Sequence, residues 1–165
     1  MFFLTLDFEG SLKTGIREIG AIISEGSDIL GFEDLTVEGN RECIQSLNKI
    51  LSSPPELFIS HNVHIEKNLL KKYLPYRKCT SRLAELEWGP WLDTKEMYKI
   101  LYPQIKQYGL QHLTNIFVKK ESVQVCKKYC ANEKMSHHNA LYDAICTFLL
   151  FKRVLEKVNI KEFIH

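Results

Sequence analysis

The segment Phe3-Leu4-Thr5-Leu6-Asp7-Phe8-Glu9 joins a short apolar run to two acidic residues. It is too short for a buried helix, and its composition favours a β-strand. Residues two apart on a strand point to the same face, so Asp7 and Glu9 would present neighbouring carboxylates. Two such carboxylates on a hydrophobic strand repel each other, and a bound cation would relieve this repulsion. Oxygen ligands of this kind suit Mg²⁺ or Mn²⁺.

A second pattern is His138-Asn139-Ala140-Leu141-Tyr142-Asp143. Asn139 can cap a helix that continues to Leu155, which would put Asp143 in or just after the first turn and His138 immediately before it. The positive end of the helix dipole favours a carboxylate at Asp143, and a neutral imidazole at His138 could accept a proton from water. The pattern therefore predicts an acid and a general base at one helix N-terminus.

These two patterns resemble the DEDDh-type 3′→5′ exonucleases. The first motif of that family is D-x-E followed by an I-x-E-I-G-A-like strand, and it matches residues 7–9 and 16–22. The third motif, H-x-A-x-x-D, matches residues 138–143 at every defined position.

The family's second motif, H-N-x-x-F-D, matches residues 61–66 with two changes. Ile65 stands in place of the aromatic residue, and Glu66 stands in place of the usual Asp. Residues 91–94 and 108–113 are weaker matches that fall in the family's order, so the resemblance covers nearly the whole chain.

The resemblance implies a ribonuclease H-like α/β fold, in which a mixed sheet is flanked by helices. It also implies hydrolysis of DNA or RNA from the 3′ end to nucleoside 5′-monophosphates. Asp7, Glu9, Glu66 and Asp143 would hold two divalent cations, Mg²⁺ or Mn²⁺, and His138 would deprotonate the attacking water.

The residues that the resemblance places near the terminal nucleotide are Phe8, Gly10, His61 and Asn62. Gly10 occupies a position where the family often has Thr, so one polar contact to the substrate would be missing. The Phe8 side chain should belong to the core, because it points away from the two acids on a regular strand. Alternatively, His61 is an ordinary surface or capping residue.

The remaining patterns predict how the elements follow one another. Strands near 2–8, 16–24 and 28–37, with turns at Gly10-Ser11 and residues 25–28, indicate a three-stranded meander. Further short strands are expected at 57–59 and near 91–92, and helices near 41–51, 63–73, 94–101, 110–117 and 139–155. Strands followed by alternating strand and helix indicate an α/β sheet.

The chain has 165 residues and shows no internal repeat or long linker, so one domain over 1–165 is expected. Its net charge of +2 creates no general basic field, and a nucleic-acid surface would have to be a local patch. The densest basic stretch comprises Lys67, Lys71, Lys72, Arg77 and Lys78, continued by Lys119, Lys120, Lys127 and Lys128. Any one of these lysines could equally belong to a solvated helix face.

No apolar segment approaches the ~20 residues that span a bilayer, and the N-terminal run reads as a strand rather than a signal peptide. We therefore expect no membrane partner. Five cysteines without framework spacing predict reduced thiols and a cytoplasmic location. A zinc site from Cys126, Cys130, His137 and His138 is an alternative, although its spacing departs from that of usual structural sites.

Two alternative functions remain compatible with the sequence. One is a nucleic-acid or polymerase-binding module that keeps the fold but handles metal poorly, because the extra methylene of Glu66 moves its carboxylate by about 1.5 Å. The other is an RNA-specific exonuclease of the same family, which would depend on contacts to the 2′-hydroxyl. The expected partners are single-stranded or 3′-terminal nucleic acid and a DNA polymerase.

Overall fold

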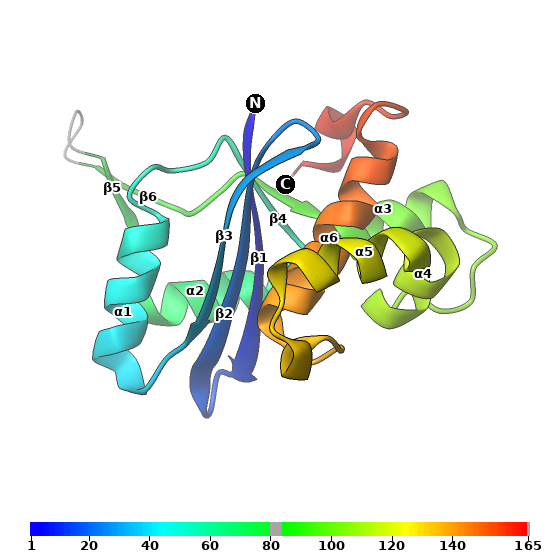
Figure 1. Ribbon diagram of the computed structural model, residues 1–165. Helices are drawn as coiled ribbons and strands as arrows, with labels where there is room; N and C mark the ends of the chain where they lie inside the picture. The colour runs from blue at the N-terminus through cyan, green and yellow to red at the C-terminus, as the bar shows by residue number, and fades with distance from the viewer. Residues whose placement is uncertain (80–83, 165) are drawn as a thin grey trace.

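The computed structural model describes residues 1–79 and 84–164, and its main sheet has five strands in the order β3-β2-β1-β4-β7 (Figure 1). The strands of this sheet are β1 (Phe2–Ser11), β2 (Gly15–Glu25), β3 (Asp28–Thr36), β4 (Leu57–Ser60) and β7 (Trp91–Asp93). A separate hairpin consists of β5 (Arg77–Cys79) and β6 (Ala84–Leu86).

The helices are α1 (Gly39–Ile50), α2 (Val63–Tyr73), α3 (Thr94–Leu101), α4 (Leu110–Phe117), α5 (Lys119–Tyr129) and α6 (Ala140–Leu155), with short 3₁₀ turns η1 (Asn132–Lys134) and η2 (Ile160–Phe163). No helix in the described part of the chain is both long and apolar enough to cross a bilayer.

The sheet is mixed about its central strand. β1 pairs antiparallel with β2 and parallel with β4, while β2 pairs antiparallel with β3 and β4 pairs parallel with β7. The predicted meander of the first three strands is therefore confirmed. The α/β class with a mixed sheet flanked by helices is confirmed as well.

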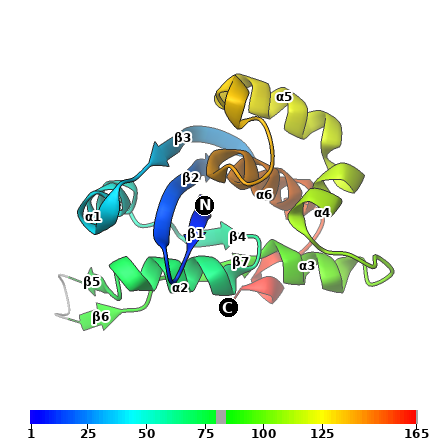
Figure 2. The same ribbon diagram turned by 90° about the horizontal axis from the view of Figure 1, so that it is seen from below.

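Helices cover both faces of the sheet (Figure 2). On β1, Leu4, Leu6 and Phe8 pack into a core with α1 and α2, whereas Phe3 packs into a core with α6 and its neighbouring helices. Because side chains alternate along a strand, Asp7 and Glu9 point to the same side as Phe3, toward α6. The expected core position of the Phe8 side chain is confirmed, since Phe8 is buried.

Gly20 allows α6 to approach the acidic end of the sheet. It pairs with Asp7 across β1 and β2, and a Cβ atom at this position would lie 2.1 Å from the carbonyl carbon of Ala140. Any side chain would therefore push the first turn of α6 away from β2. A single glycine thus places the helix that carries Asp143 directly beside Asp7.

Gly10 and Ser11 lie in β1, so the turn predicted at these residues is wrong. The pairing register shifts between Glu9 and Gly10, and the strand continues past this bulge before the chain reverses at residues 12–14. Gly10 has a φ of +152°, and a Cβ atom there would lie 2.1 Å from the Gly15 carbonyl oxygen. The close approach of β1 and β2 explains why threonine is absent here.

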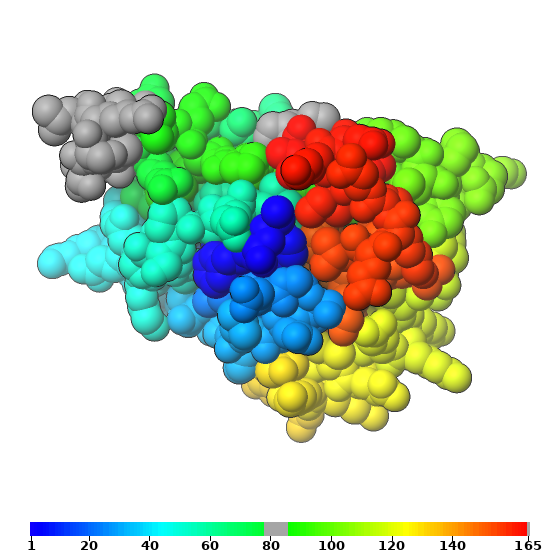
Figure 3. Space-filling model, turned by 90° about the horizontal axis from the view of Figure 1, so that it is seen from above, coloured from blue at the N-terminus to red at the C-terminus, as the bar shows by residue number. Residues whose placement is uncertain are grey.

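The sequence patterns missed α5 and the β5–β6 hairpin. The fully buried residues of α5 are Ser122 and Cys126, and Val125 and Tyr129 are only partly buried, so its inward face lacks the large aliphatic side chains that make an amphipathic helix easy to recognise. Viewed from above, at the end of the molecule where β1 begins, the start of β1 lies beside the C-terminal segment (Figure 3). Ile164 of that segment forms an antiparallel bridge with Leu92 of β7.

Candidate metal centre and active site

Four acidic residues from three elements meet at one end of the sheet. Asp7 and Glu9 come from the end of β1, Asp143 from the first turn of α6, and Glu66 from the first turn of α2. Glu66 is 5% exposed and Asp143 is 7% exposed, while Asp7 and Glu9 are half-buried. The structure thus brings together the acids that the sequence singled out.

His138 lies beside two of these acids. Its ring and the carboxylates of Glu9 and Asp143 offer ligand atoms that all lie within 4.8 Å of one another. Carboxylate oxygens together with an imidazole nitrogen form a donor set that divalent cations accept.

Burial and mutual repulsion raise the pKa values of Asp7, Glu9 and Glu66. Burial raises the pKa of Asp7 well above its usual range, and the neighbouring carboxylates of Glu66, Asp143 and Glu9 raise it further. Burial also raises the pKa of Glu66 to about 8, helped by repulsion from Glu9 and only partly opposed by the Phe8 backbone amide. These groups would be stabilised as carboxylates by a nearby cation.

Glu9 follows the same trend more weakly. Burial raises its pKa, and Asp143 adds to the rise, whereas His138 opposes it. Glu66 supplies a second observation that fits a cation, because its buried Oε2 atom has no hydrogen-bond partner among the described residues. Unpaired buried oxygens of this kind are costly unless they contact a ligand.

Asp143 is held in place by His137 and His138 of the loop before α6. Its Oδ1 atom contacts Nδ1 of His137, and its Oδ2 atom accepts a hydrogen bond from the His138 backbone amide at 3.0 Å. The His137 ring also meets the edge of Tyr142, with ring centroids 5.0 Å apart. Sequence reasoning gave His137 no role at Asp143, since the family motif does not define this position.

The loop that carries His138 is anchored to the sheet by an ion-pair network. The ammonium group of Lys134 lies 2.9 Å from Asp34 Oδ1 and 3.7 Å from Glu18 Oε2, which joins η1 to β3 and β2. His138 itself has a left-handed backbone with a φ of 69°. Asn139 occupies the predicted N-cap position, but its side chain donates to Ser136 instead of accepting from the helix.

His61 is tied into the fold through both ring nitrogens. Its Nε2 donates to the Tyr108 carbonyl at 2.9 Å, which leaves Nδ1 to accept from the Thr94 hydroxyl at 2.9 Å. Burial lowers the pKa of His61, in keeping with a neutral ring. Both partners belong to the weaker family matches at 91–94 and 108–113, so these segments lie next to the second motif. The assignment of His61 to the substrate stays a prediction.

Asp93 is a positioning residue that the sequence analysis did not single out. Its carboxylate accepts from the backbone amides of Asn62 at 3.0 Å and Val63 at 2.9 Å. As the N-cap of α3, it also accepts a hydrogen bond from the Lys95 backbone amide at 2.8 Å. One carboxylate therefore joins the starts of α2 and α3 and fixes Asn62, whose φ of 75° is left-handed. The sequence signal that could have identified Asp93 is its position directly before a predicted helix.

A hollow of about 310 Å³ lies between α2 and the turn after β1. It is lined by Gly10, Ser11, Leu12, His64, Ile65, Asn68 and Leu69. Its volume lies at the lower end of the range for small-ligand sites.

The chain is similar in sequence to part of a bacterial DNA polymerase. No family model matches the chain. The chain is 27% identical over 139 residues to "DNA polymerase III PolC-type" of Halalkalibacterium halodurans, an alignment that covers 84% of this chain and 8% of the polymerase. The chain thus corresponds to a small part of that much longer protein.

Solved structures match over almost the whole chain. Exonuclease X in complex with 5′ overhanging duplex DNA has a TM-score of 0.64 and 18% identity, over 98% of this chain and 96% of its own. E. coli Exonuclease I in complex with a dT13 oligonucleotide has a TM-score of 0.65 and 15% identity, over 98% of this chain and 42% of its own. The chain has the ribonuclease H-like fold of these exonucleases.

The resemblance to the DEDDh-type exonucleases is thereby confirmed for the fold. A zinc-bound form of the E. coli ExoI-ssDNA complex, with a TM-score of 0.63 and 16% identity over 94% of this chain and 40% of its own, shows that a protein of this fold binds metal.

The alternative zinc set is not assembled. Within residues 1–79 and 84–164, the group of three or more metal-ligating side chains is Glu9, His138 and Asp143, without Cys126 or Cys130. The cysteines whose side chains are described, Cys43, Cys126, Cys130 and Cys146, are free thiols, as expected.

Proposed function

We propose that this chain is a metal-dependent 3′→5′ exonuclease that hydrolyses the phosphodiester bonds of DNA or RNA and releases nucleoside 5′-monophosphates. The observation that carries the proposal is the meeting of Asp7, Glu9, Glu66 and Asp143 beside His138. Carboxylates that repel one another at the end of a sheet are costly to fold, and a divalent-metal site accounts for the arrangement.

The donor set fits two Mg²⁺ or Mn²⁺ ions. Asp7, Glu9 and Asp143 would hold one of them, and Asp7 with Glu66 would hold the other. When bound, the two ions would lower the pKa of a water molecule and stabilise the charge on the attacking and leaving oxygens.

Residues of the chain itself would carry out the remaining steps. His138 would accept the proton of the attacking water, since its ring lies beside Glu9 and Asp143 at the exposed edge of the site. His137 and the His138 amide would keep the Asp143 carboxylate in one orientation. The hollow at Gly10 and the backbone of Phe8 and Asn62 would receive the terminal nucleotide.

The proposal is tested by digestion of end-labelled single-stranded DNA and RNA with Mg²⁺ or Mn²⁺. Shortening from the 3′ end with release of 5′-monophosphates supports it, and an Asp7→Asn variant should show none of this activity. Binding of labelled strands without any hydrolysis in either metal would instead support the non-catalytic module. The ratio of DNA to RNA digestion gives the sugar preference.

The polymerase relative motivates a further arm of the proposal, which is association with a DNA polymerase in the cytoplasm. Co-purification of a tagged chain with a polymerase from its host would support this association. Recovery of the chain alone would identify it as a stand-alone enzyme.

A further inference from the structure

The two basic stretches singled out in the sequence have different surroundings in the structure. On α2, the ammonium groups of Lys71 and Lys67 lie 2.9 Å and 3.5 Å from the carboxylate of Glu87. Lys72 donates to the Leu12 carbonyl at 2.9 Å. These lysines are therefore already engaged by the protein.

The lysines of α5 are exposed, and the Lys128 ammonium lies 4.9 Å from the centroid of the Tyr129 ring. Lys119, Lys120, Lys127 and Lys128 form no ion pair with a carboxylate in the part of the chain that the structure describes. The acidic residue of α5, Glu121, lies 3.8 Å from Lys152 instead. The helix consequently presents uncompensated positive charge to solvent.

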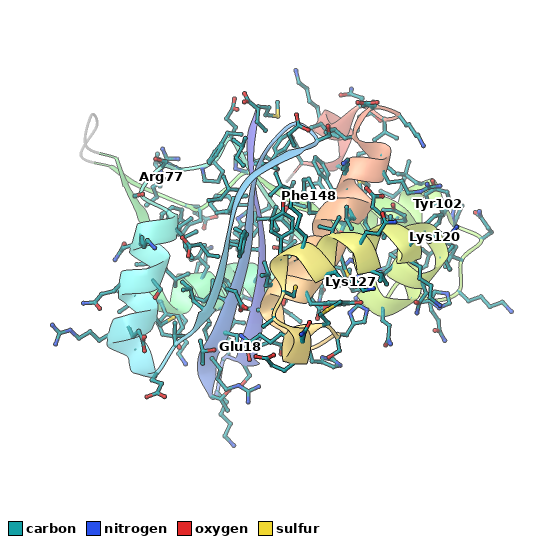
Figure 4. The ribbon with its side chains drawn as sticks, in the orientation of Figure 1. Glu18, Arg77, Tyr102, Lys120, Lys127 and Phe148 are labelled. Carbon is teal, nitrogen blue, oxygen red and sulfur yellow. The ribbon has the colours of Figure 1, made fainter. Side chains whose placement is uncertain are left out.

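The spacing of these lysines puts them on one face. Ser122 and Cys126 turn inward, while Lys120, Lys127 and Lys128 recur after seven and eight residues on the outward side. We name Lys120, Lys127 and Lys128 the lysine face. At a rise of ~1.5 Å per residue, it extends about 12 Å along the helix. Figure 4 labels Lys120 and Lys127 toward the two ends of α5.

The lysine face belongs to the helix that neighbours the site. α5 packs along α6, the helix that carries Asp143, as Figures 1 and 2 both show. The chain leaves α5 at Cys130 and reaches His138 through η1. α5 therefore lies one helix away from the acid cluster and is joined to it by the loop that carries His138.

We propose that the lysine face binds the phosphate backbone of the nucleic-acid strand whose 3′ end occupies the site. This inference rests on the proposed exonuclease function and adds where the rest of the substrate lies. A length of about 12 Å spans about three phosphates of one strand at ~3.4 Å of helix axis per nucleotide of B-form DNA. Lysines contact phosphates as point charges, so this binding would be independent of sequence.

The test reverses two charges of the lysine face and uses a matched control. The variant is Lys120→Glu with Lys128→Glu, and the control is Arg41→Glu with Lys49→Glu on α1. Both pairs are exposed, lie eight residues apart on one helix and change the charge equally. α1 lies on the opposite side of the sheet (Figure 1).

Binding is measured by fluorescence anisotropy with a labelled oligonucleotide in the Asp7→Asn background, which prevents hydrolysis. The lysine-face variant should bind roughly tenfold more weakly, and the slope of log K against log salt should fall by about 2. The α1 control should keep the affinity and slope of its parent. Equal behaviour of the two variants would overturn the proposal.

A small substrate separates this inference from the proposed function. Hydrolysis of the p-nitrophenyl ester of thymidine 5′-monophosphate, which cannot reach α5, should proceed equally in the otherwise wild-type chain with and without the lysine-face changes. Loss of this activity as well would assign the defect to the site and contradict a separate strand-binding role. A wild-type chain that hydrolyses neither substrate, but still loses affinity when the lysine face is reversed, would refute the exonuclease proposal alone.

Discussion

The two helices that bring acids to the site treat their carboxylates in opposite ways. At the start of α6, both oxygens of Asp143 are engaged, one by His137 and the other by the His138 amide. At the start of α2, Glu66 is equally buried, yet its Oε2 has no partner among the described residues. The protein thus engages both oxygens of Asp143 and leaves one oxygen of Glu66 unpaired among the described residues.

This difference shows how a site can be partly preorganised. Hydrogen bonds from neighbouring residues fix a ligand's direction before a metal arrives. A buried acid with fewer such bonds is harder to ionise, and burial raises the pKa of Glu66 although the Phe8 backbone amide opposes the rise.

The largest effect is expected at Asp7, which faces the acids of both helices. Asp7→Asn should lower hydrolysis by several orders of magnitude, because under the proposed mechanism Asp7 would help to hold both cations. The metal-free variant should melt at a higher temperature than wild type, since burial and repulsion raise the pKa of Asp7. Activity assays and thermal unfolding in EDTA check both results.

Chelation serves as the control for this prediction. Wild-type activity should vanish in excess EDTA and return when Mg²⁺ or Mn²⁺ is restored. Undiminished hydrolysis in EDTA would rule out the metal-dependent mechanism.

On the α6 side of the site, the largest loss of activity is expected when His138 is changed. His138→Ala should lower kcat by ~10²–10⁴-fold, as expected for a lost general base, while KM changes little. His137→Ala should cost less, ~10–100-fold, because it loosens only the orientation of Asp143. Steady-state kinetics of the two variants under equal conditions checks this order. A large loss at His137 with near wild-type activity at His138 would show that the general base is the other histidine.

On the α2 side of the site, the role of Glu66 is tested by changing the length and the charge of its side chain. Glu66→Gln should reduce activity on the order of 10²-fold, or about 2.7 kcal/mol in the barrier. Glu66→Asp should keep activity and shift the preference between Mn²⁺ and Mg²⁺, because Mg²⁺ demands near-ideal octahedral geometry. Rates in each metal check this, and we expect wild type to prefer Mn²⁺. Wild-type rates for Glu66→Gln in both metals would remove Glu66 from the site.

The smallest effect concerns stability against pH. The pKa of Glu66 is raised from 4.5 to about 8, so its contribution to stability is fully present below about 4.5 and is lost as pH rises toward 8. The melting temperature of the metal-free protein should therefore fall as pH rises from about 4.5 to about 8, and that of Glu66→Gln should fall less. Calorimetry in EDTA checks the slopes, and parallel curves for the two proteins would contradict the assignment.

Local signals were sufficient to predict much of the fold. The predicted end of α2 is an example, because α2 ends at Tyr73, two residues before Pro75, which disfavours a helix at the residue before it. The alternation in β1 likewise predicted the face that carries Asp7 and Glu9. α5 could not be predicted in this way, because it buries few apolar side chains.

The contacts that complete the site are long-range and left no local pattern. Asp93 holds the start of α2 from a strand about 30 residues away. Gly20 matters because it meets the backbone of α6, and Gly10 because it meets Gly15 across the bulge. These roles depend on the folded arrangement, which the sequence motifs indicate only through the family resemblance.

The most direct test of the central claim counts bound metal. Mn²⁺ binding to the wild-type chain and to Glu66→Gln is measured by electron paramagnetic resonance at pH 8 with a saturating nucleoside 5′-monophosphate. The account predicts two ions for wild type and one for Glu66→Gln, because Asp143 and Glu9 keep one site while the other loses its acid. Two ions in both proteins, or none in wild type, would contradict it.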